Sequence, residues 1–162
     1  MATGTILIDV LSVHQDNTNP PGIEWLTSGV PYLSFDDTTD ELLTVAFRLP
    51  DDYASGLAYK WQYSMASATA NNVAVRTQVK AVTDGTEDIG SATAATLEAS
   101  ADNVVPGTAG YTKTVSHSFS NLDSAAAGDY IEIQFGRENG TSGTNATGDM
   151  YLHTLTLTYT TT

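Results

Sequence analysis

Large apolar residues recur at every second position over much of the chain, the spacing that turns one face of a β-strand toward a core. Residues 42–49 show this alternation, and residues 57–65 show it most strongly. Turn-forming residues, among them Pro50 and Gly56, separate the two runs, so we expect a central hairpin over residues 42–65. Its second arm should bury Leu57, Tyr59, Trp61, Tyr63 and Met65.

The same spacing predicts further strands over residues 31–35, 73–81, 111–119, 130–135 and 150–160. In the last of these, simple alternation turns Tyr151, His153, Leu155, Leu157 and Tyr159 inward. Eight to ten short strands separated by turns are typical of a sandwich rather than of crossover units with helices. The sequence therefore predicts an all-β, single-domain antiparallel β-sandwich of jelly-roll type.

The N-terminal part lacks this clean alternation. Residues 5–13 are rich in β-branched side chains on both parities, as expected of a strand covered on both faces or lying between subunits. We therefore divide the chain into an N-terminal strand and extended arm, residues 1–30, and a sandwich, residues 31–162. A second irregular segment, the Gly-rich stretch 136–149, is expected to stand away from the sandwich as a loop.

Charge narrows the range of partners. Six Lys and Arg against nineteen Asp and Glu give a net charge of −13 and a pI near 4.1, a balance that repels nucleic-acid phosphates and anionic membranes. Three of the cations, Lys60, Arg76 and Lys80, take outward strand positions, where we expect them to pair with neighbouring carboxylates.

The N-terminus has no signal-peptide pattern and no window is long and apolar enough to span a bilayer, so synthesis and use in a cytoplasm are expected.

The sequence contains no recognisable catalytic set. It has no cysteine, no Gly-x-Ser-x-Gly elbow and no close histidine pair, and we predict neither enzymatic activity nor a cofactor. Two alternatives involve carboxylates. Glu24, Glu132 and Glu138 are of the type that glycosidases use, and the acidic turns 36–41 and 84–88 have the oxygens for calcium without the spacing of a dedicated loop.

Three motifs carry a resemblance to a known group of proteins. A turn from Leu49 to Gly56 contains Leu-Pro-x-x-Tyr-x-x-Gly, an Ala-Gly-Asp triplet ends at Asp129, and the closing strand ends at Tyr159. Over residues 42–160 the chain resembles the small jelly-roll-like virion proteins of tailed bacteriophages.

That resemblance implies a capsid decoration (cement) protein that binds the major capsid protein on the outer shell of the virion, as a homotrimer made in the host cytoplasm. The head of a tail fibre or spike is the related alternative. A clamp of this kind must bury on the order of 800 Å² per partner. The contact residues that we predict for it are Ile6, Leu7, Ile8, Trp25, Tyr32 and Tyr159.

Two other classes of function stay open at this point. A β-sandwich that presents aromatic side chains such as Trp25, Tyr32 or Tyr53 to sugar rings would be a carbohydrate-binding module. Two acids facing each other across a cleft would instead indicate a glycosidase.

Overall fold

Twelve strands and no helix make up the regular structure of the computed structural model, which describes residues 2–15, 18–139 and 144–162. The described residues therefore contain no helix that could cross a membrane. In chain order the strands are β1 (Thr3–Ile8), β2 (His14–Gln15), β3 (Gly22–Trp25), β4 (Pro31–Phe35), β5 (Leu42–Arg48), β6 (Tyr53–Met65), β7 (Asn72–Val82), β8 (Glu98–Ala99), β9 (Asn103–Val104), β10 (Lys113–Ser118), β11 (Tyr130–Glu138) and β12 (Met150–Thr161).

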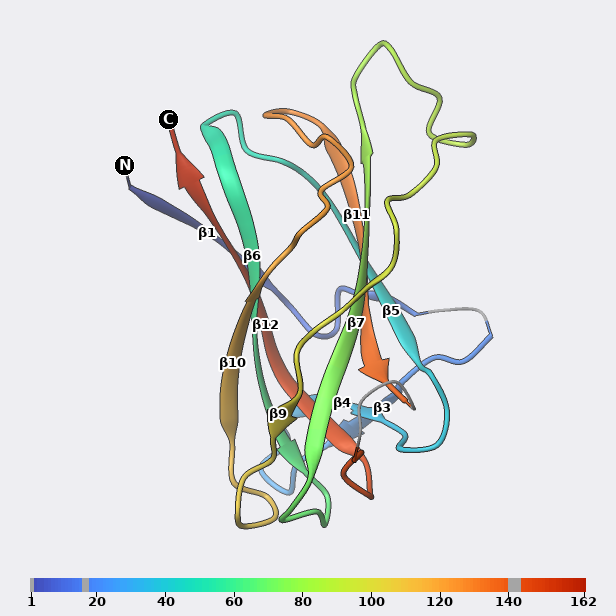
Figure 1. The fold of residues 1–162 in the computed structure, drawn as a ribbon, viewed down its shortest axis with the longest axis vertical. Coiled ribbons are helices and arrows are strands. Elements are labelled where there is room, and N and C mark those ends of the chain that lie inside the picture. The colour runs from blue at the N-terminus through green and yellow to red at the C-terminus, as the bar shows by residue number, and fades with distance from the viewer. Residues whose placement is uncertain (1, 16–17, 140–143) are drawn as a thin grey trace.

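The strands form two sheets that face each other (Figure 1). Sheet A has the order β10-β6-β12-β4-β3, and β1 lies beside β12 beyond the end of β4. Sheet B has the order β2-β5-β11-β7-β8, with β9 also paired to β7. Every pairing between these strands is antiparallel, so the predicted all-β antiparallel sandwich is confirmed.

Within sheet A, β6 lies between β10 and β12 and supplies much of the core. Its predicted inward residues are almost fully buried, and Trp61 is inaccessible to solvent. The Trp61 ring meets the ring of Phe135 from sheet B at 6.1 Å, edge to face, which is a favourable geometry for an aromatic pair. Contacts of this kind join the two sheets into a single core.

The predicted hairpin over residues 42–65 is wrong, although both of its strands form. β5 pairs with β2 and β11 in sheet B, whereas β6 pairs with β10 and β12 in sheet A. The short segment from Leu49 to Asp52 therefore crosses from one sheet to the other. Each strand has one apolar face, and placing the two strands in opposite sheets buries both faces in the same core.

A register shift in β12 changes which of its residues face the core. Leu152 is opposite Tyr63 and Thr154 is opposite the next β6 residue, Gln62, so His153 is an extra residue in the ladder. Such a bulge reverses the facing of the residues before it relative to those after it. The expected inward facing of Tyr151 and His153 is therefore wrong, and both point to the outer side of sheet A, while Leu152 is buried.

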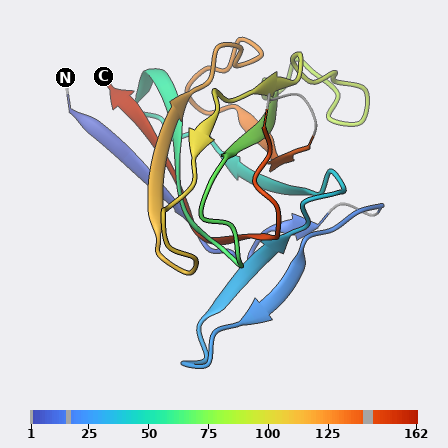
Figure 2. The same cartoon turned by 60° about the horizontal axis from the view of Figure 1, so that its bottom comes forward.

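The first thirty residues contribute β1 and β3 to sheet A and β2 to sheet B. β1 runs antiparallel to β12 from Thr3 opposite Thr160 to Ile8 opposite Leu155, which places the two ends of the chain side by side (Figure 1). The β3–β4 hairpin projects from the body of the sandwich (Figure 2). The division into an arm and a sandwich stays a prediction.

The expectation for residues 136–149 is wrong for the residues that the structure describes there. β11 continues to Glu138, and the Arg137 side chain is 1% exposed. Its guanidinium donates hydrogen bonds to the backbone oxygens of Gly148 and Ala146, and Ala146 is itself buried. These bonds hold the described part of the segment against the sandwich.

Candidate functional site

Two cavities meet on the outer face of sheet A and together form what we call the sheet A groove. The first has a volume of about 500 Å³ and is lined by Leu26, Val30, Ser64, Thr112, Tyr151 and His153, among others. The second has a volume of about 360 Å³ and is lined by Thr5, Lys60, Thr114, Thr156 and Thr158. Gln62 and Thr154 line both, so the two cavities adjoin each other.

Three rings gather at one end of the groove because the β12 bulge turns two of them outward. The Tyr32 ring lies 4.6 Å from that of Tyr151 and 5.9 Å from that of His153. Tyr32 is fixed by the hydrogen bond that its hydroxyl donates to Glu24 at 2.6 Å, and this bond raises the pKa of Tyr32. Tyr151 remains partly exposed and lines the cavity itself.

The imidazole of His153 is held in place by Ser64, whose Oγ lies 2.9 Å from His153 Nε2. Burial lowers the pKa of His153, so the neutral ring is favoured in the folded protein. A neutral imidazole, a serine hydroxyl and the amide of Gln62 give this end of the groove both donors and acceptors of hydrogen bonds.

The other end of the groove is a floor of hydroxyl groups around one cation. Thr154, Thr156 and Thr158 are outward residues of β12, as their spacing predicted. Lys60 of β6 is directly opposite Thr156 and is exposed. The groove therefore changes from an aromatic end to a polar, positively charged end.

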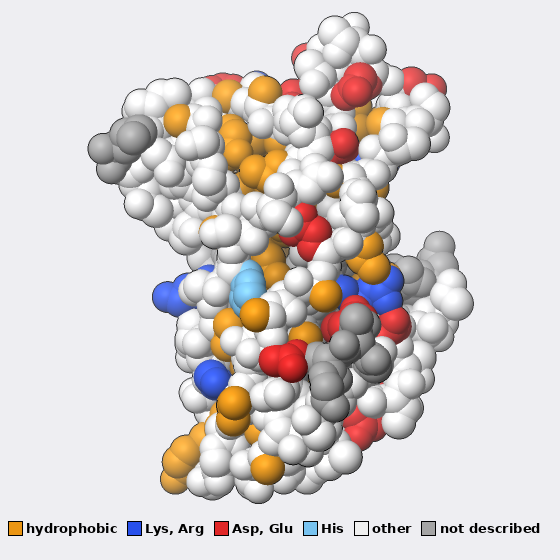
Figure 3. All heavy atoms as spheres, viewed as in Figure 1, with side chains coloured by type: hydrophobic (Ala, Val, Ile, Leu, Met, Phe, Trp, Pro, Cys, Tyr) orange, Lys and Arg blue, Asp and Glu red, His pale blue; other side chains and the backbone are white. Residues whose placement is uncertain are grey.

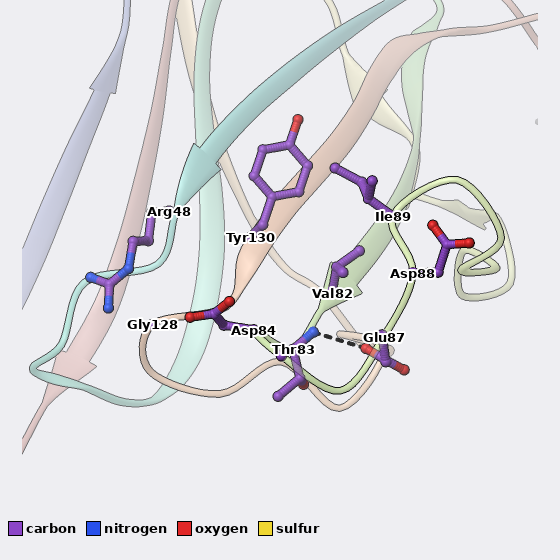
Figure 4. Close-up of a pocket in the computed structure, with 10 residues that line it drawn as sticks. Arg48, Val82, Thr83, Asp84, Glu87, Asp88, Ile89, Gly128 and Tyr130 are labelled. Carbon is purple, nitrogen blue, oxygen red and sulfur yellow. Dashed lines mark hydrogen bonds between the residues drawn. The ribbon is translucent and has the colours of Figure 1, made fainter.

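A third cavity, of about 520 Å³, lies where sheet B meets the loop after β7 (Figure 4). The side chains of Tyr130, Val82 and Ile89 lie together at its apolar side. Asp84 and Glu87 lie at its other side, and Glu87 accepts a hydrogen bond from the backbone N–H of Thr83 at 2.8 Å. The acidic groups and the small apolar side make this cavity chemically distinct from the sheet A groove.

Charged groups are dispersed over one face of the protein (Figure 3). On the face drawn in Figure 3, uncharged polar side chains and backbone predominate, and the acidic side chains lie scattered among them. The net charge of −13 is therefore not gathered into one acidic field on this face.

The predicted partner-contact residues fall into two groups. Leu7 and Trp25 are 74% and 59% exposed. Ile8, Tyr32 and Tyr159 are buried within the chain itself, and Ile6 packs partly against the core. Burial gives these four an intramolecular packing role, and the contact with a partner stays a prediction.

The aromatic residues considered for sugar binding are also distributed differently from the expectation. Tyr53 is buried against Tyr159, and Trp25 lies on the projecting hairpin. Tyr32 borders the sheet A groove. Tyr151 and His153, which line the groove, were not predicted from the sequence as candidates for sugar binding. The sequence does carry a signal for them: residues 150–153 are all large, so large side chains occupy both alternating sets of positions there. Such a break in the alternation indicates a bulge.

The three glutamates considered for glycosidase chemistry do not meet. Glu24 lies in sheet A beside Tyr32, whereas Glu132 and Glu138 belong to β11 in sheet B. Glu132 pairs with Lys80 at 3.0 Å. Within the described residues, no group of three or more Asp, Glu or His has the geometry to hold a metal ion.

Comparisons with known proteins identify the fold but no family. No protein-family model and no curated protein sequence matches the chain. Among solved structures, the C-terminal CBM6 of the marine laminarinase LamC from Zobellia galactanivorans is similar over 96% of this chain and 99% of its own, with a TM-score of 0.52 and 14% identity. The family 35 carbohydrate-binding module of Clostridium thermocellum matches over 95% and 97%, with a TM-score of 0.51 and 8% identity. The xylan-binding module CBM15 matches over 99% of both chains, with a TM-score of 0.51 and 12% identity. These similarities define the chain as a jelly-roll β-sandwich of the kind found in carbohydrate-binding modules.

Proposed function

We propose that this chain is a non-catalytic carbohydrate-binding module that holds an oligosaccharide in the sheet A groove. The observation that carries the proposal is that the two cavities adjoin on one face, with partly exposed Tyr151 at one end and a hydroxyl-lined floor at the other. Known sandwiches with the same fold support this assignment, since the similar structures include a xylan-binding module and a module of a laminarinase.

The chemistry of the groove suits a sugar chain. A pyranose ring has C–H faces that pack on aromatic rings and a rim of hydroxyls that both donate and accept hydrogen bonds. Tyr151 supplies the aromatic surface, while Gln62, Ser64 and His153 supply polar partners beside it. A ligand site of this composition, with a few polar groups set in a concave surface, is the usual form of a small-molecule site.

Replacing Tyr151 tests this assignment. We expect Tyr151→Ala to weaken binding of an oligosaccharide, selected on a glycan array and measured by calorimetry, by about tenfold. Tyr130→Ala is the matched control, because Tyr130 lines the cavity beside the β7–β8 loop instead. Circular dichroism and the melting temperature establish that both variants fold.

Three outcomes separate the possibilities. Loss of affinity in Tyr151→Ala alone supports the groove. Loss in Tyr130→Ala alone would move the sugar site to the other cavity. Failure of the wild-type protein to retain any glycan on the array would overturn the proposal.

A second candidate function is that of a virion structural protein, and the projecting β3–β4 hairpin favours it. Ile23 and Trp25 share a face with core residue Leu33, because Ile23 is directly opposite Leu33 and Trp25 lies two residues further on. Yet Ile23 and Trp25 are 48% and 59% exposed, so part of the inward face of the hairpin is uncovered. A capsid or a neighbouring copy of the chain would cover such a face.

This alternative is tested by assembly. A decoration protein should sediment with shells of the virus that encodes it and form a trimer by light scattering, and Trp25→Ala should weaken both. A monomer that stays in the supernatant while binding glycans would reject the virion assignment.

A further inference from the structure

We infer that the ligand of the sheet A groove carries a negative charge, as a uronate carboxylate or a sulfate ester, and that Lys60 is the residue that selects it. The inference rests on the proposed sugar-binding function and adds to it the class of sugar.

Lys60 is the exception among the six cationic residues of the chain. Within the described part of the structure it makes no hydrogen bond and no ion pair. The partners of the other five are Asp51 for Arg48, Asp40 for Arg76, Glu132 for Lys80, and backbone oxygens for Lys113 and Arg137. Arg76 and Lys80 pair with carboxylates as expected, whereas Lys60 does not. Because the ammonium group of Lys60 has no partner among the described residues, it is available to a ligand.

The neighbours of Lys60 across the sheet explain its lack of a partner. On one side lies Thr156 of β12, and beyond it Leu7 of β1; on the other side lies Ser116 of β10. Side chains directly opposite one another lie on the same face, so this row offers only hydroxyls and one leucine. Hydroxyls can donate hydrogen bonds to an anionic oxygen without adding a competing negative charge.

Among the residues that the structure describes, no acidic side chain lines the groove. The chain has nineteen Asp and Glu residues, and three of them, Asp84, Glu87 and Asp88, line the cavity beside the β7–β8 loop. The described residues that line the two cavities of the groove include neither Asp nor Glu. On a surface this acidic, a groove without carboxylates and with one unpaired lysine is complementary to an anionic group.

The distance between the two ends indicates an extended ligand. Ser64 and Lys60 are four residues apart in β6, which corresponds to about 13 Å along the strand. We therefore expect that a sugar packed on Tyr151 does not also reach Lys60 through its own substituents. The charged group belongs to another residue of the same oligosaccharide.

The test compares charged and uncharged forms of the same sugar chains. Calorimetry would measure binding of oligogalacturonates and their methyl esters, of sulfated carrageenan oligosaccharides and their desulfated forms, and of neutral xylan and laminarin oligosaccharides. We expect one charged form to bind about tenfold more tightly than its uncharged counterpart, the size of effect expected of one charge-assisted hydrogen bond. Lys60→Gln should remove that preference and Lys60→Arg should keep it. The carboxylate and sulfate series identify which anion is recognised.

Lys80→Gln is the matched control, because it removes the same charge from an outward strand position in sheet B. A preference for the charged form that disappears in Lys60→Gln and persists in Lys80→Gln supports the inference. Equal or tighter binding of neutral sugars, unchanged in Lys60→Gln, overturns the inference and leaves the sugar-binding function in place. An absence of binding to every sugar overturns both.

Discussion

Gly4 packs directly against the ring of Tyr159. A β-carbon at residue 4 would lie 2.1 Å from Cζ of Tyr159, far inside van der Waals contact. The ring has little freedom to move away, because its hydroxyl donates a hydrogen bond to Asp52 at 3.0 Å and its other neighbour is Tyr53, with ring centres 5.9 Å apart. Only glycine lets β1 approach β12 this closely.

We therefore expect Gly4→Ala to destabilise the protein by about 1–3 kcal/mol, the usual cost of forcing an extra group into a packed site. Urea unfolding measures the change. Gly107→Ala is the control, since nothing beyond its own chain neighbours lies within 4 Å of the position that its β-carbon would take. Equal stability of the two variants would show that the Tyr159 ring moves aside without cost.

Arg137 is a buried cation whose neighbours depend on it. Its side chain donates a 2.7 Å hydrogen bond to the backbone oxygen of Gly148, and burial lowers its pKa. The carboxylates of Asp37 and Asp149 act on this pKa in the opposite direction, because they stabilise the charged guanidinium. Removing the guanidinium would leave these groups uncompensated.

Arg137→Met is expected to lower the free energy of unfolding by about 3–5 kcal/mol, the range found when one partner of a buried ionic group is deleted. Thermal and urea unfolding give the value. Arg48→Met, which removes an exposed arginine paired with Asp51, should change stability little. A small effect of both substitutions would mean that water replaces the Arg137 hydrogen bonds.

Glu41 should make stability decrease as the pH rises. Burial raises the pKa of Glu41, and the nearby charges of Asp36 and Asp149 act in the same direction. The folded protein therefore binds more protons than the unfolded chain from the ordinary value of 4.5 upward, and the free energy of unfolding falls across that interval. The loss is complete above the folded-state pKa.

Glu41→Gln keeps an oxygen to accept the hydrogen bond from the backbone N–H of Asp36 but does not titrate. Its stability relative to wild type should therefore rise from pH 4 toward pH 7, as measured by unfolding at a series of pH values. Parallel curves for the two proteins would show that Glu41 titrates with an ordinary pKa.

The parts of the fold that the sequence predicted are those with a local signal. Alternation along 57–65 identifies the buried face of β6 correctly, because the period of two belongs to the strand itself. The pairing partner is not local. The turn from Leu49 to Asp52 has the composition of a hairpin turn, yet it connects two sheets, and no residue within it distinguishes these outcomes.

The candidate site was less predictable for the same reason. A single extra residue, His153, changes the face on which Tyr151 lies, and the bulge depends on the register with β6. The lack of a partner for Lys60 depends likewise on which strands flank it. Arg76 and Lys80 found the expected carboxylates in sheet B, whereas Lys60 faces Thr156.

His153 should make stability decrease as the pH falls, the opposite direction to Glu41. Burial lowers the pKa of His153 below 6.5, so between the folded-state pKa and 6.5 the unfolded chain binds more protons than the folded one. The free energy of unfolding therefore rises with pH in this interval and reaches its full value above 6.5.

His153→Gln retains a side-chain partner for Ser64 and does not titrate, so unfolding of this variant should depend less on pH between about 5 and 7. A His153→Gln protein as sensitive to pH as wild type would mean that the imidazole is hydrated in the folded state, and that the aromatic end of the groove is open to water at His153.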